Sequence, residues 1–201
     1  RPEQLLELYE FEACPFCRKV REALSSFDLD AMIYPCPRGG RLRDVVKQKG
    51  KKLMFPFLVD PNTGTEMYES NDIIAYLAKT YGDGGVPALL SLGPVTTLGS
   101  FFASASRPGR GRVARPNKQP AKPLELWSFE ASPYCRLARE VLCELELPYI
   151  LHNVAKGSAS RAAFEAMSGK MMVPYLKDPN TGAAMFESAA IVKYLDATYA
   201  A

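Results

Sequence analysis

The stretches FEACPFCRKV (residues 11–20) and FEASPYCRLA (residues 129–138) nearly repeat each other. The first stretch contains Cys14 and Cys17 in a C-x-x-C spacing. The second stretch has Ser132 where the first cysteine of that motif would stand, although it keeps the later cysteine. A recurrence of this kind indicates that one unit of structure occurs twice in the chain.

The repetition extends far beyond the two motifs. The offset from Cys17 to Cys135, 118 residues, aligns residues 6–81 with residues 124–199 without a gap. The sequence DPNTG recurs at the same place in both copies, and MYES in the first copy faces MFES in the second. Copies of about 80 residues are large enough to fold, particularly if they bury surface against each other. We therefore predict a first domain over residues 1–83, a linker over 84–122 and a second domain over 123–201.

Each copy shows the same order of secondary-structure signals. LELYEF at residues 6–11 and its counterpart LELWSF alternate apolar and polar residues, as a half-buried strand does. Pro15 and Pro133 follow at positions suited to the first turn of a helix. A second strand, a charged helix, two strands joined by the DPNTG turn and a last helix complete each copy.

This order of elements, with C-x-x-C at the first strand–helix junction, is typical of a thioredoxin-like arrangement. We therefore predict an α/β protein with two tandem thioredoxin-like domains, each a four-stranded mixed sheet flanked by helices. The composition, 47% hydrophobic and 23% charged, is that of a soluble globular protein with a hydrophobic core.

Charge and cysteine usage narrow the class of function. A net charge of +3 gives no reason to expect a nucleic-acid partner, and we predict none. Five cysteines, an odd number, favour reactive thiols in a reducing compartment over a disulfide framework. The chain has no second C-x-x-C motif and one histidine, so we expect no four-ligand zinc site and no metal.

The predicted linker is apolar first and basic afterwards. Residues 86–106 carry no charge, and residues 107–122 carry basic residues without an acidic one. Proline, glycine and hydroxyl residues make the apolar part a poor membrane-spanning helix, so packing against the two domains is the favoured interpretation. The basic part is expected to be a solvated linker. The alternative is that residues 86–122 touch an anionic membrane.

The complete motif predicts thiol chemistry. A cysteine at the start of a helix has its thiolate stabilised by free backbone N–H groups and the helix dipole, so Cys14 is the candidate nucleophile. Cys17, one turn further on, is placed to resolve a mixed disulfide formed on Cys14. Cys36 follows the second strand and is either an alternative resolving thiol or a buried inert cysteine. Cys143, in the middle of a helix, is expected in the core.

Two further pairs of positions recur beside these motifs. Pro56 and Pro174 open the third strand of each copy, where a cis proline would leave neighbouring backbone groups free to pair with a peptide-like ligand. An ordinary edge-strand proline is the alternative. Ser70 and Ser188, each preceded by a glutamate, begin the last helix of their copies. They either bind a carboxylate at the helix N-terminus or act as N-caps worth about 1 kcal/mol.

Taken together, each copy resembles glutaredoxins and the N-terminal, thioredoxin-like domain of glutathione transferases. The resemblance covers both copies and implies that the strand–proline backbone binds the cysteinyl part of glutathione and the Glu-Ser pair its γ-glutamyl end. It implies a first site of Cys14, Phe55, Pro56, Glu69 and Ser70 with Lys52 near the glycyl carboxylate, and a second of Ser132, Val173, Pro174, Glu187 and Ser188 with Lys170.

The two motifs resemble different members of this group. CPFC is similar to the active-site tetrapeptide of dithiol glutaredoxins, whereas SPYC resembles serine-type transferases, in which a hydroxyl keeps the glutathione thiolate ionised. Ser132 is therefore either such a donor or the N-cap of a decayed copy. Neither copy is followed by the all-helical domain of transferases, so the other copy or the linker must cover the face that this domain would hide.

The resemblance implies a glutathione-linked thiol–disulfide oxidoreductase with one redox-active and one redox-inactive repeat. Its co-substrate would be glutathione and its partners protein disulfides. The alternatives are an atypical glutathione transferase, and a non-catalytic module that binds glutathione, an iron–sulfur cluster or a partner. Tandem copies joined by an apolar linker also resemble plant and algal thioredoxin-like proteins of the chloroplast, which implies a chloroplast location.

Overall fold

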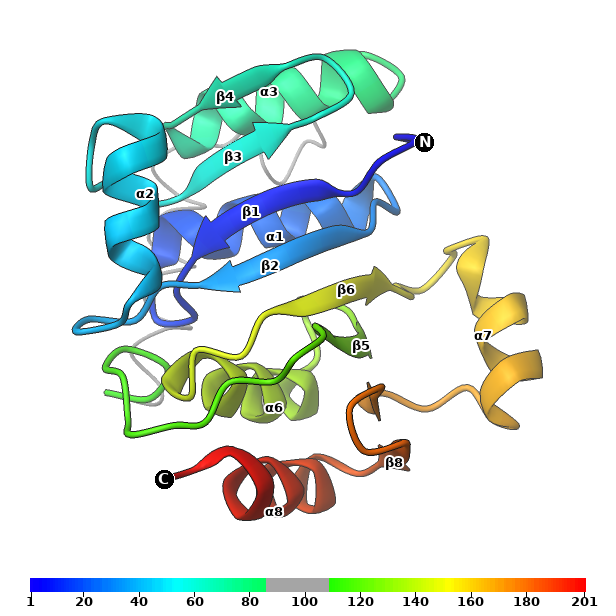
Figure 1. The fold of residues 1–201 in the computed structure, drawn as a ribbon. Helices are drawn as coiled ribbons and strands as arrows, with labels where there is room; N and C mark the ends of the chain where they lie inside the picture. Colours follow the sequence, from blue (N-terminus) through cyan, green and yellow to red (C-terminus); the bar gives the residue numbers. More distant parts are fainter. Residues whose placement is uncertain (86–108) are drawn as a thin grey trace.

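The computed structural model describes residues 1–85 and 109–201. Both copies show the predicted order of strands and helices (Figure 1). The first copy contains β1 (Leu6–Glu10), α1 (Pro15–Ser26), β2 (Ala31–Pro35), α2 (Leu42–Gly50), β3 (Phe57–Asp60), β4 (Thr65–Met67) and α3 (Ser70–Tyr81). The second copy contains β5 (Leu124–Ser128), α6 (Pro133–Glu144), β6 (Tyr149–Asn153), α7 (Ser160–Ser168), β7 (Tyr175–Asp178), β8 (Ala183–Phe186) and α8 (Ser188–Tyr199).

The two copies share a single sheet, so the expectation of two separate four-stranded sheets is wrong. The sheet has eight strands in the order β4-β3-β1-β2-β6-β5-β7-β8. Each copy contributes four of them, and β2 joins β6 in an antiparallel pair in which Met32 faces Ile150. An unpaired β2 would present a row of free N–H and C=O groups, and this pairing satisfies them.

The helices form two layers on either side of the sheet (Figure 1). Helices α1, α3, α6 and α8 pack on one face over a single hydrophobic core to which both copies contribute. Helices α2 and α7 pack on the opposite face over two separate small clusters, one in each copy. Both copies therefore contribute to a single hydrophobic core on this face of the sheet.

Strand alternation divides the side chains between these cores. Leu6 and Leu8 of β1 point into the shared core. Tyr9, the next residue of the strand, points to the other face, into the cluster under α2. The apolar stripe of α1 packs in the same way, with Val20 and Leu24 fully buried in the shared core. The period-two and period-3.6 patterns of the sequence thus account for the layers.

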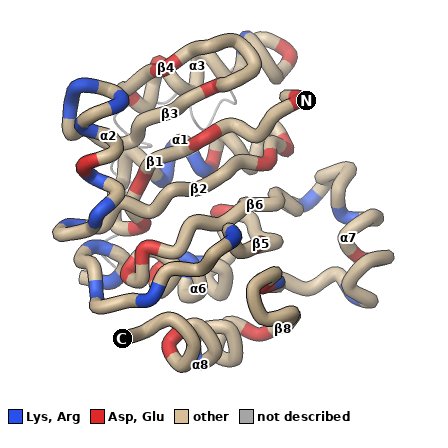
Figure 2. The backbone as a smooth tube through the Cα atoms, in the orientation of Figure 1, with Lys and Arg blue, Asp and Glu red and all other residues tan. Residues whose placement is uncertain are grey.

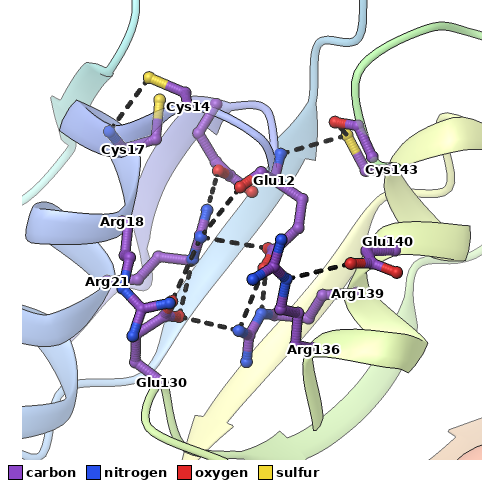
Figure 3. A network of polar contacts seen from close by, with 12 residues as sticks. Glu12, Cys14, Cys17, Arg18, Arg21, Glu130, Arg136, Arg139, Glu140 and Cys143 are labelled. Carbon is purple, nitrogen blue, oxygen red and sulfur yellow. Dashed lines mark hydrogen bonds and ion pairs between the residues drawn. The ribbon is translucent and has the colours of Figure 1, made fainter. Parts of the chain in front are cut away.

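A buried network of charges joins α1 to α6 (Figure 3). The guanidinium of Arg21 contacts Glu130 at 2.8 Å and Glu12 at 3.2 Å. The guanidinium of Arg139 contacts the same two carboxylates, Glu12 at 3.1 Å and Glu130 at 3.1 Å. All four side chains are at most 2% exposed. Each arginine therefore binds one glutamate from its own copy and one from the other.

Most positions of the network correspond between the two copies. Residues separated by the 118-residue offset take equivalent places, so Arg21 corresponds to Arg139 and Glu12 to Glu130. Glu10 also pairs with Arg21, whereas the corresponding Ser128 accepts a hydrogen bond from Arg139. Arg18 also contacts Glu130 at 3.6 Å, and the additional carboxylate, Glu10, lies in the first copy.

The segment 109–118 lies against the junction of the two copies, while its basic residues Arg110, Arg112 and Lys118 are exposed. The N–H of Gly111 donates to Glu144, and its carbonyl accepts from the N–H of Ala13 at 3.3 Å. Gly111 has φ +65°, and a Cβ there would lie 2.7 Å from the Cβ of Glu12, so the site requires glycine. Further along, the backbone N–H of Lys118 donates a hydrogen bond to the carbonyl of Tyr199.

None of the helices in the part of the chain that the structure describes has the length and apolar character needed to cross a membrane. The apolar stretch 86–106, expected to pack against the domains or touch a membrane, lies outside the described residues. The boundaries of residues 1–83 and 123–201 stay predictions.

Replacement of Arg139 by methionine is expected to lower the free energy of unfolding by about 3–5 kcal/mol, because it leaves two buried carboxylates with one arginine fewer. Urea unfolding measures the difference. Lys49→Met is the matched control: it removes a half-exposed ion pair with Glu7 and installs the residue found at the corresponding Met167. It should cost less than about 1 kcal/mol. Equal losses in the two variants would contradict the prediction.

Candidate functional site

The two motif-bearing loops lie at opposite ends of the strands, one at each end of the sheet. Within each copy the first two strands are parallel, and β2 and β6 are antiparallel, so β1 and β5 run in opposite directions (Figure 1). Cys14 follows the end of β1 and Ser132 the end of β5. The two candidate sites are therefore separated by the length of the strands, and one small ligand cannot contact both.

Cys14 is the N-cap of α1. Its sulfur accepts a hydrogen bond from the backbone N–H of Cys17 at 3.2 Å (Figure 3). A hydrogen bond from the Cys17 thiol, with that of the backbone N–H, lowers the pKa of Cys14 in spite of burial. Pro15 occupies the first turn, where its missing N–H removes no helical hydrogen bond. The geometry thus favours a thiolate at Cys14, and its role as a nucleophile stays a prediction.

The other thiols of the first copy are buried and protonated. Burial and the neighbouring Cys14 raise the pKa of Cys17, which is fully buried. Burial likewise raises the pKa of Cys36, whose thiol donates to the carbonyl of Tyr34 at 3.3 Å. This arrangement favours the interpretation of Cys36 as a buried inert cysteine. Cys143, expected in the core, is buried and accepts a hydrogen bond from the N–H of Glu12 (Figure 3).

The proline loop lies beside the Cys14 loop. Pairing of Tyr9 with Phe57 places the residue before β3 next to the residue after β1, and the rings of Phe11 and Phe55 meet edge to face at 5.7 Å. The Phe55–Pro56 peptide bond is cis, as predicted for this position.

The Glu69-Ser70 pair reaches the same edge by way of β4. Met67 faces Leu58 in the sheet, so the chain that follows β4 runs beside the start of β3. Glu69 is exposed at the N-terminus of α3 with φ +68°, a conformation uncommon outside glycine, and Ser70 is buried behind it. The ammonium of Lys19 bonds Asn71 at 2.7 Å, which ties the start of α1 to the start of α3.

The second copy repeats this geometry around a hydroxyl. Ser132 has φ −78° and ψ 119°, against −80° and 119° for Cys14, and accepts a hydrogen bond from the N–H of Cys135. Val173–Pro174 is cis, and Glu187 has φ +70°. Ser188, like Ser70, is buried at the first position of its helix.

The two lysines of the candidate sites occupy different settings. Lys52 is exposed, and its carbonyl accepts from the hydroxyl of Tyr68 at 2.8 Å. The ammonium of Lys170 lies 4.4 Å from the ring centroid of Phe186, a cation–π contact. Both lie at the edge of their proline loop. Their assignment to the glycyl carboxylate of glutathione stays a prediction.

A buried carboxylate lies close to the dithiol. Glu10 ends β1, is 1% exposed and pairs with Arg21. Burial raises its pKa from 4.5 to about 7 in spite of the arginine, and the nearby carboxylates of Glu12 and Glu130 add to the effect. Its charge in turn opposes thiolate formation at Cys14 and Cys17. The protonation of Glu10 therefore influences the chemistry of the motif.

The charged network was not predicted from the sequence, although a signal for it exists. The offset places the same charged residues at corresponding positions, with Arg21 and Arg139 next to the apolar stripes of their helices. A charge that recurs beside a core stripe in both copies indicates a buried partner. Among the described residues, no group of three or more His, Cys, Asp or Glu side chains is arranged to hold a metal ion.

A cavity of about 580 Å³ lies at the C-terminal ends of α1 and α3, where Phe27 and Tyr81 line it. Since α1 begins at Pro15, directly after Cys14, and has twelve residues, this cavity is about 18 Å from the motif along the helix. It therefore does not belong to the first candidate site.

The fold and the paired loops define a protein of thioredoxin-like domains. The family described as "Glutathione S-transferase, N-terminal domain" matches residues 8–87 and residues 126–201, which together make up most of the chain. The chain belongs to this family, with two copies of the domain. Among curated proteins, none matches the sequence at a significant level.

Several solved glutathione transferases are similar to parts of the chain. One from Bombyx mori, in complex with GTT, is 25% identical over 41% of this chain and 38% of its own, with a TM-score of 0.37. A delta-class enzyme from Nilaparvata lugens is 26% identical over 39% of this chain and 37% of its own, with a TM-score of 0.34. The trimeric enzyme of Leishmania is 14% identical over 96% and 67%, with a TM-score of 0.35.

The matched part is a little more than a third of the length of the insect enzymes. Because these TM-scores are below 0.5, the family membership rests on the sequence match over both copies.

The pH dependence of alkylation tests the hydrogen bond to Cys14. Replacement of Cys17 by alanine removes the thiol that most lowers the pKa of Cys14, so the alkylation profile of Cys14 should move to higher pH. Cys17→Ser keeps a hydroxyl donor, so its alkylation profile should lie between those of the wild type and Cys17→Ala. Iodoacetamide labelling read by peptide mass spectrometry gives the profiles. Cys135→Ala, the corresponding change in the second copy, is the control, and an unmoved profile in Cys17→Ala would refute the assignment.

Glu10 makes stability depend on pH. Its folded-state pKa, about 7, is above its ordinary 4.5, so the folded protein binds the proton more tightly and the free energy of unfolding falls as pH rises from about 4.5 to about 7. Glu10→Ser, which copies Ser128, should remove this fall, a difference of up to about 3 kcal/mol. Urea unfolding at pH 5 and pH 8 measures it. The control is Glu66→Ala, which copies Ala184 at an exposed position; identical pH dependence in the wild type and Glu10→Ser would exclude the proposed burial effect.

Proposed function

We propose that the chain is a glutathione-linked thiol–disulfide oxidoreductase with one redox-active and one redox-inactive repeat. Membership of the glutathione S-transferase N-terminal domain family supports a glutathione-related function. The observation that carries the finer proposal is the pair of thiols at the start of α1, where the pKa of Cys14 is lowered and that of Cys17 is raised. A thiolate beside a protonated partner thiol is the arrangement that dithiol exchange requires.

In the proposed reaction, the Cys14 thiolate attacks one sulfur of a disulfide substrate. A bond forms between Cys14 and that sulfur, the substrate S–S bond breaks, and the departing thiolate takes a proton. Cys17 then loses its proton and attacks the sulfur of Cys14, which releases the second substrate thiol and leaves a Cys14–Cys17 disulfide. Two glutathione thiols reduce this disulfide and become glutathione disulfide, so two electrons pass from glutathione to the substrate.

Glutathione would bind at the edge where the Phe55–Pro56 loop, the Glu69-Ser70 pair and the Cys14 loop meet. The free N–H groups at the start of α3 would hold the γ-glutamyl carboxylate, and Glu69 its ammonium group. The backbone before Pro56 would pair with the cysteinyl part, so that its sulfur lies toward Cys14. A chloroplast location is part of the proposal by resemblance alone.

The second copy is a second candidate for function, because its backbone keeps the geometry of the first. Ser132 has the same dihedral angles as Cys14 and the same hydrogen bond to its helix. A hydroxyl cannot form a disulfide, but it can donate to a bound glutathione thiolate and keep it ionised. A transferase-like activity at this end of the sheet is therefore the alternative proposal.

Glutathione-dependent reduction of a mixed disulfide between glutathione and 2-mercaptoethanol tests the first proposal. Cys14→Ser should lower the turnover at least about 100-fold, because the nucleophile is lost. Cys17→Ser should keep much of the activity, since glutathione itself can resolve the mixed disulfide on Cys14. Mass spectrometry of that variant should show one glutathione bound to Cys14 as a mixed disulfide.

Ser132→Ala is the matched control in the second copy and should leave the reductase turnover unchanged. Turnover of the mixed disulfide at the wild-type rate in Cys14→Ser would contradict the oxidoreductase proposal. Conjugation of glutathione to an electrophile such as 1-chloro-2,4-dinitrobenzene, lost in Ser132→Ala and kept in Cys14→Ser, would favour the transferase alternative instead.

A further inference from the structure

The first copy carries a strongly basic surface beside the dithiol. Residues 38–54 contain seven lysines and arginines and one acid, Asp44, which gives a net charge of +6. Helix α2 within this range lies along the edge of the sheet where β1 and β2 end, and blue residues gather there in Figure 2. The exposed members are Arg38, Arg41, Lys47, Lys49, Lys51 and Lys52.

The second copy lacks this surface. The corresponding residues 156–172 contain three basic residues and one acid, a net charge of +2. Glu165 takes the place of Lys47, and Gly169 takes the place of Lys51. The two copies share the same backbone, so the basic surface is not a requirement of the fold. It accompanies the copy that has the complete C-x-x-C motif.

Apolar side chains are exposed where the basic surface meets the motif. Phe16, inside CPFC, is 47% exposed, and Leu53 and Met54, just before the cis proline, are 48% and 41% exposed. Arg43 of α2 links the two loops, because its guanidinium lies 5.0 Å from the ring centroid of Phe55 and 5.7 Å from that of Phe11. The basic surface, the apolar rim and Cys14 therefore form one continuous region.

From this juxtaposition we infer that the first copy docks an acidic segment of a protein substrate, whose carboxylates contact α2 while its disulfide reaches Cys14. The inference rests on the proposed thiol–disulfide chemistry, for which it names the substrate class. Phe16, Leu53 and Met54 would cover the apolar neighbours of the substrate cysteine. A positive surface next to the reacting thiolate also steers an acidic partner toward it and raises the rate of association.

Glutathione alone does not account for the surface. Glutathione has two carboxylates, and the Glu-Ser pair and Lys52 already offer partners for both. Arg38, Arg41 and Lys47 lie on or before α2 and outside that set. An anionic membrane is a different explanation for exposed lysines. However, α2 exposes one large apolar side chain, Val45, whereas Phe16, Leu53 and Met54 are exposed in the motif and before the cis proline.

Matched peptide substrates test the inference on the full chain. Two synthetic peptides would carry the same central cysteine as a mixed disulfide with glutathione, one flanked by aspartate and glutamate and the other by lysine. The small disulfide of glutathione and 2-mercaptoethanol gives the reference rate. An acidic peptide with alanine in place of cysteine, labelled with a fluorophore, reports binding without any chemistry.

The sharpest variant copies the second repeat. Lys47→Glu combined with Lys51→Gly installs the residues of positions 165 and 169, and glycine suits the left-handed conformation of Lys51, at φ +60°. The wild type should prefer the acidic over the basic peptide by at least about 10-fold in kcat/KM, with the preference shrinking at high salt. In the double variant, the ratio of acidic-peptide to small-disulfide kcat/KM should fall about 10-fold. Glu165→Lys, the matched change in the second repeat, should leave all the rates unchanged.

The outcomes separate this inference from the proposed function. Turnover of the small disulfide with equal rates for the two peptides would overturn the docking surface and leave the oxidoreductase in place. Salt-dependent binding of the alanine peptide, lost in the double variant, without turnover of any disulfide would support the surface and overturn the oxidoreductase. Binding to phosphatidylserine vesicles, with no preference between the peptides, would overturn the protein-docking surface in favour of a membrane.

Discussion

Two buried arginines at the junction of the copies share carboxylates that come from both copies. Arg21 and Arg139 are fully buried, and each is neutralised by Glu12 and Glu130 together, one from each copy. Without the other copy, Arg21 would keep Glu10 and Glu12, whereas Arg139 would keep Glu130 and the hydroxyl of Ser128. The loss of one partner of a buried ion pair is strongly destabilising, so the shared carboxylates couple the stability of the two copies. The continuous sheet and the shared core depend on the same contact between α1 and α6. These helices can approach each other only if their buried arginines pair with glutamates of both copies.

This constraint acts differently on the two ends of the molecule. Glu10 adds a third carboxylate on the side of the first copy, where Ser128 stands in the second. The charge of Glu10 opposes thiolate formation at the dithiol, while the thiol and N–H of Cys17 favour a thiolate at Cys14. The junction is thus a structural element whose charge reaches the chemistry of one site. In the second copy, balanced charge accompanies a hydroxyl that does not titrate.

Much of the fold could be predicted from the sequence because its signals are local. Alternation in LELYEF, the prolines after Cys14 and Ser132 and the DPNTG turns fix the elements, and the 118-residue offset shows that there are two copies. The pairing of β2 with β6 could not be predicted, since any strand edge with a suitable pattern is an acceptable partner. The charged network was missed because polar residues on a helix are ordinarily exposed, and only the tertiary contact of α1 with α6 buries them. The docking of residues 109–118 depends likewise on the space between the copies.

The antiparallel junction also limits how two sites of one origin can be used. Had the copies been joined with β1 and β5 parallel, both motifs would open on one edge and could act on one substrate. Here they face opposite ways, so each end of the sheet meets solvent and partners independently. A difference between the ends, such as serine at position 132 or the basic residues on α2, leaves the backbone of the other end intact. Cys14 and Ser132 accordingly keep nearly the same dihedral angles, although the surfaces around them differ. Duplication with an antiparallel junction therefore retains one rigid scaffold while separating the chemistry of its two ends.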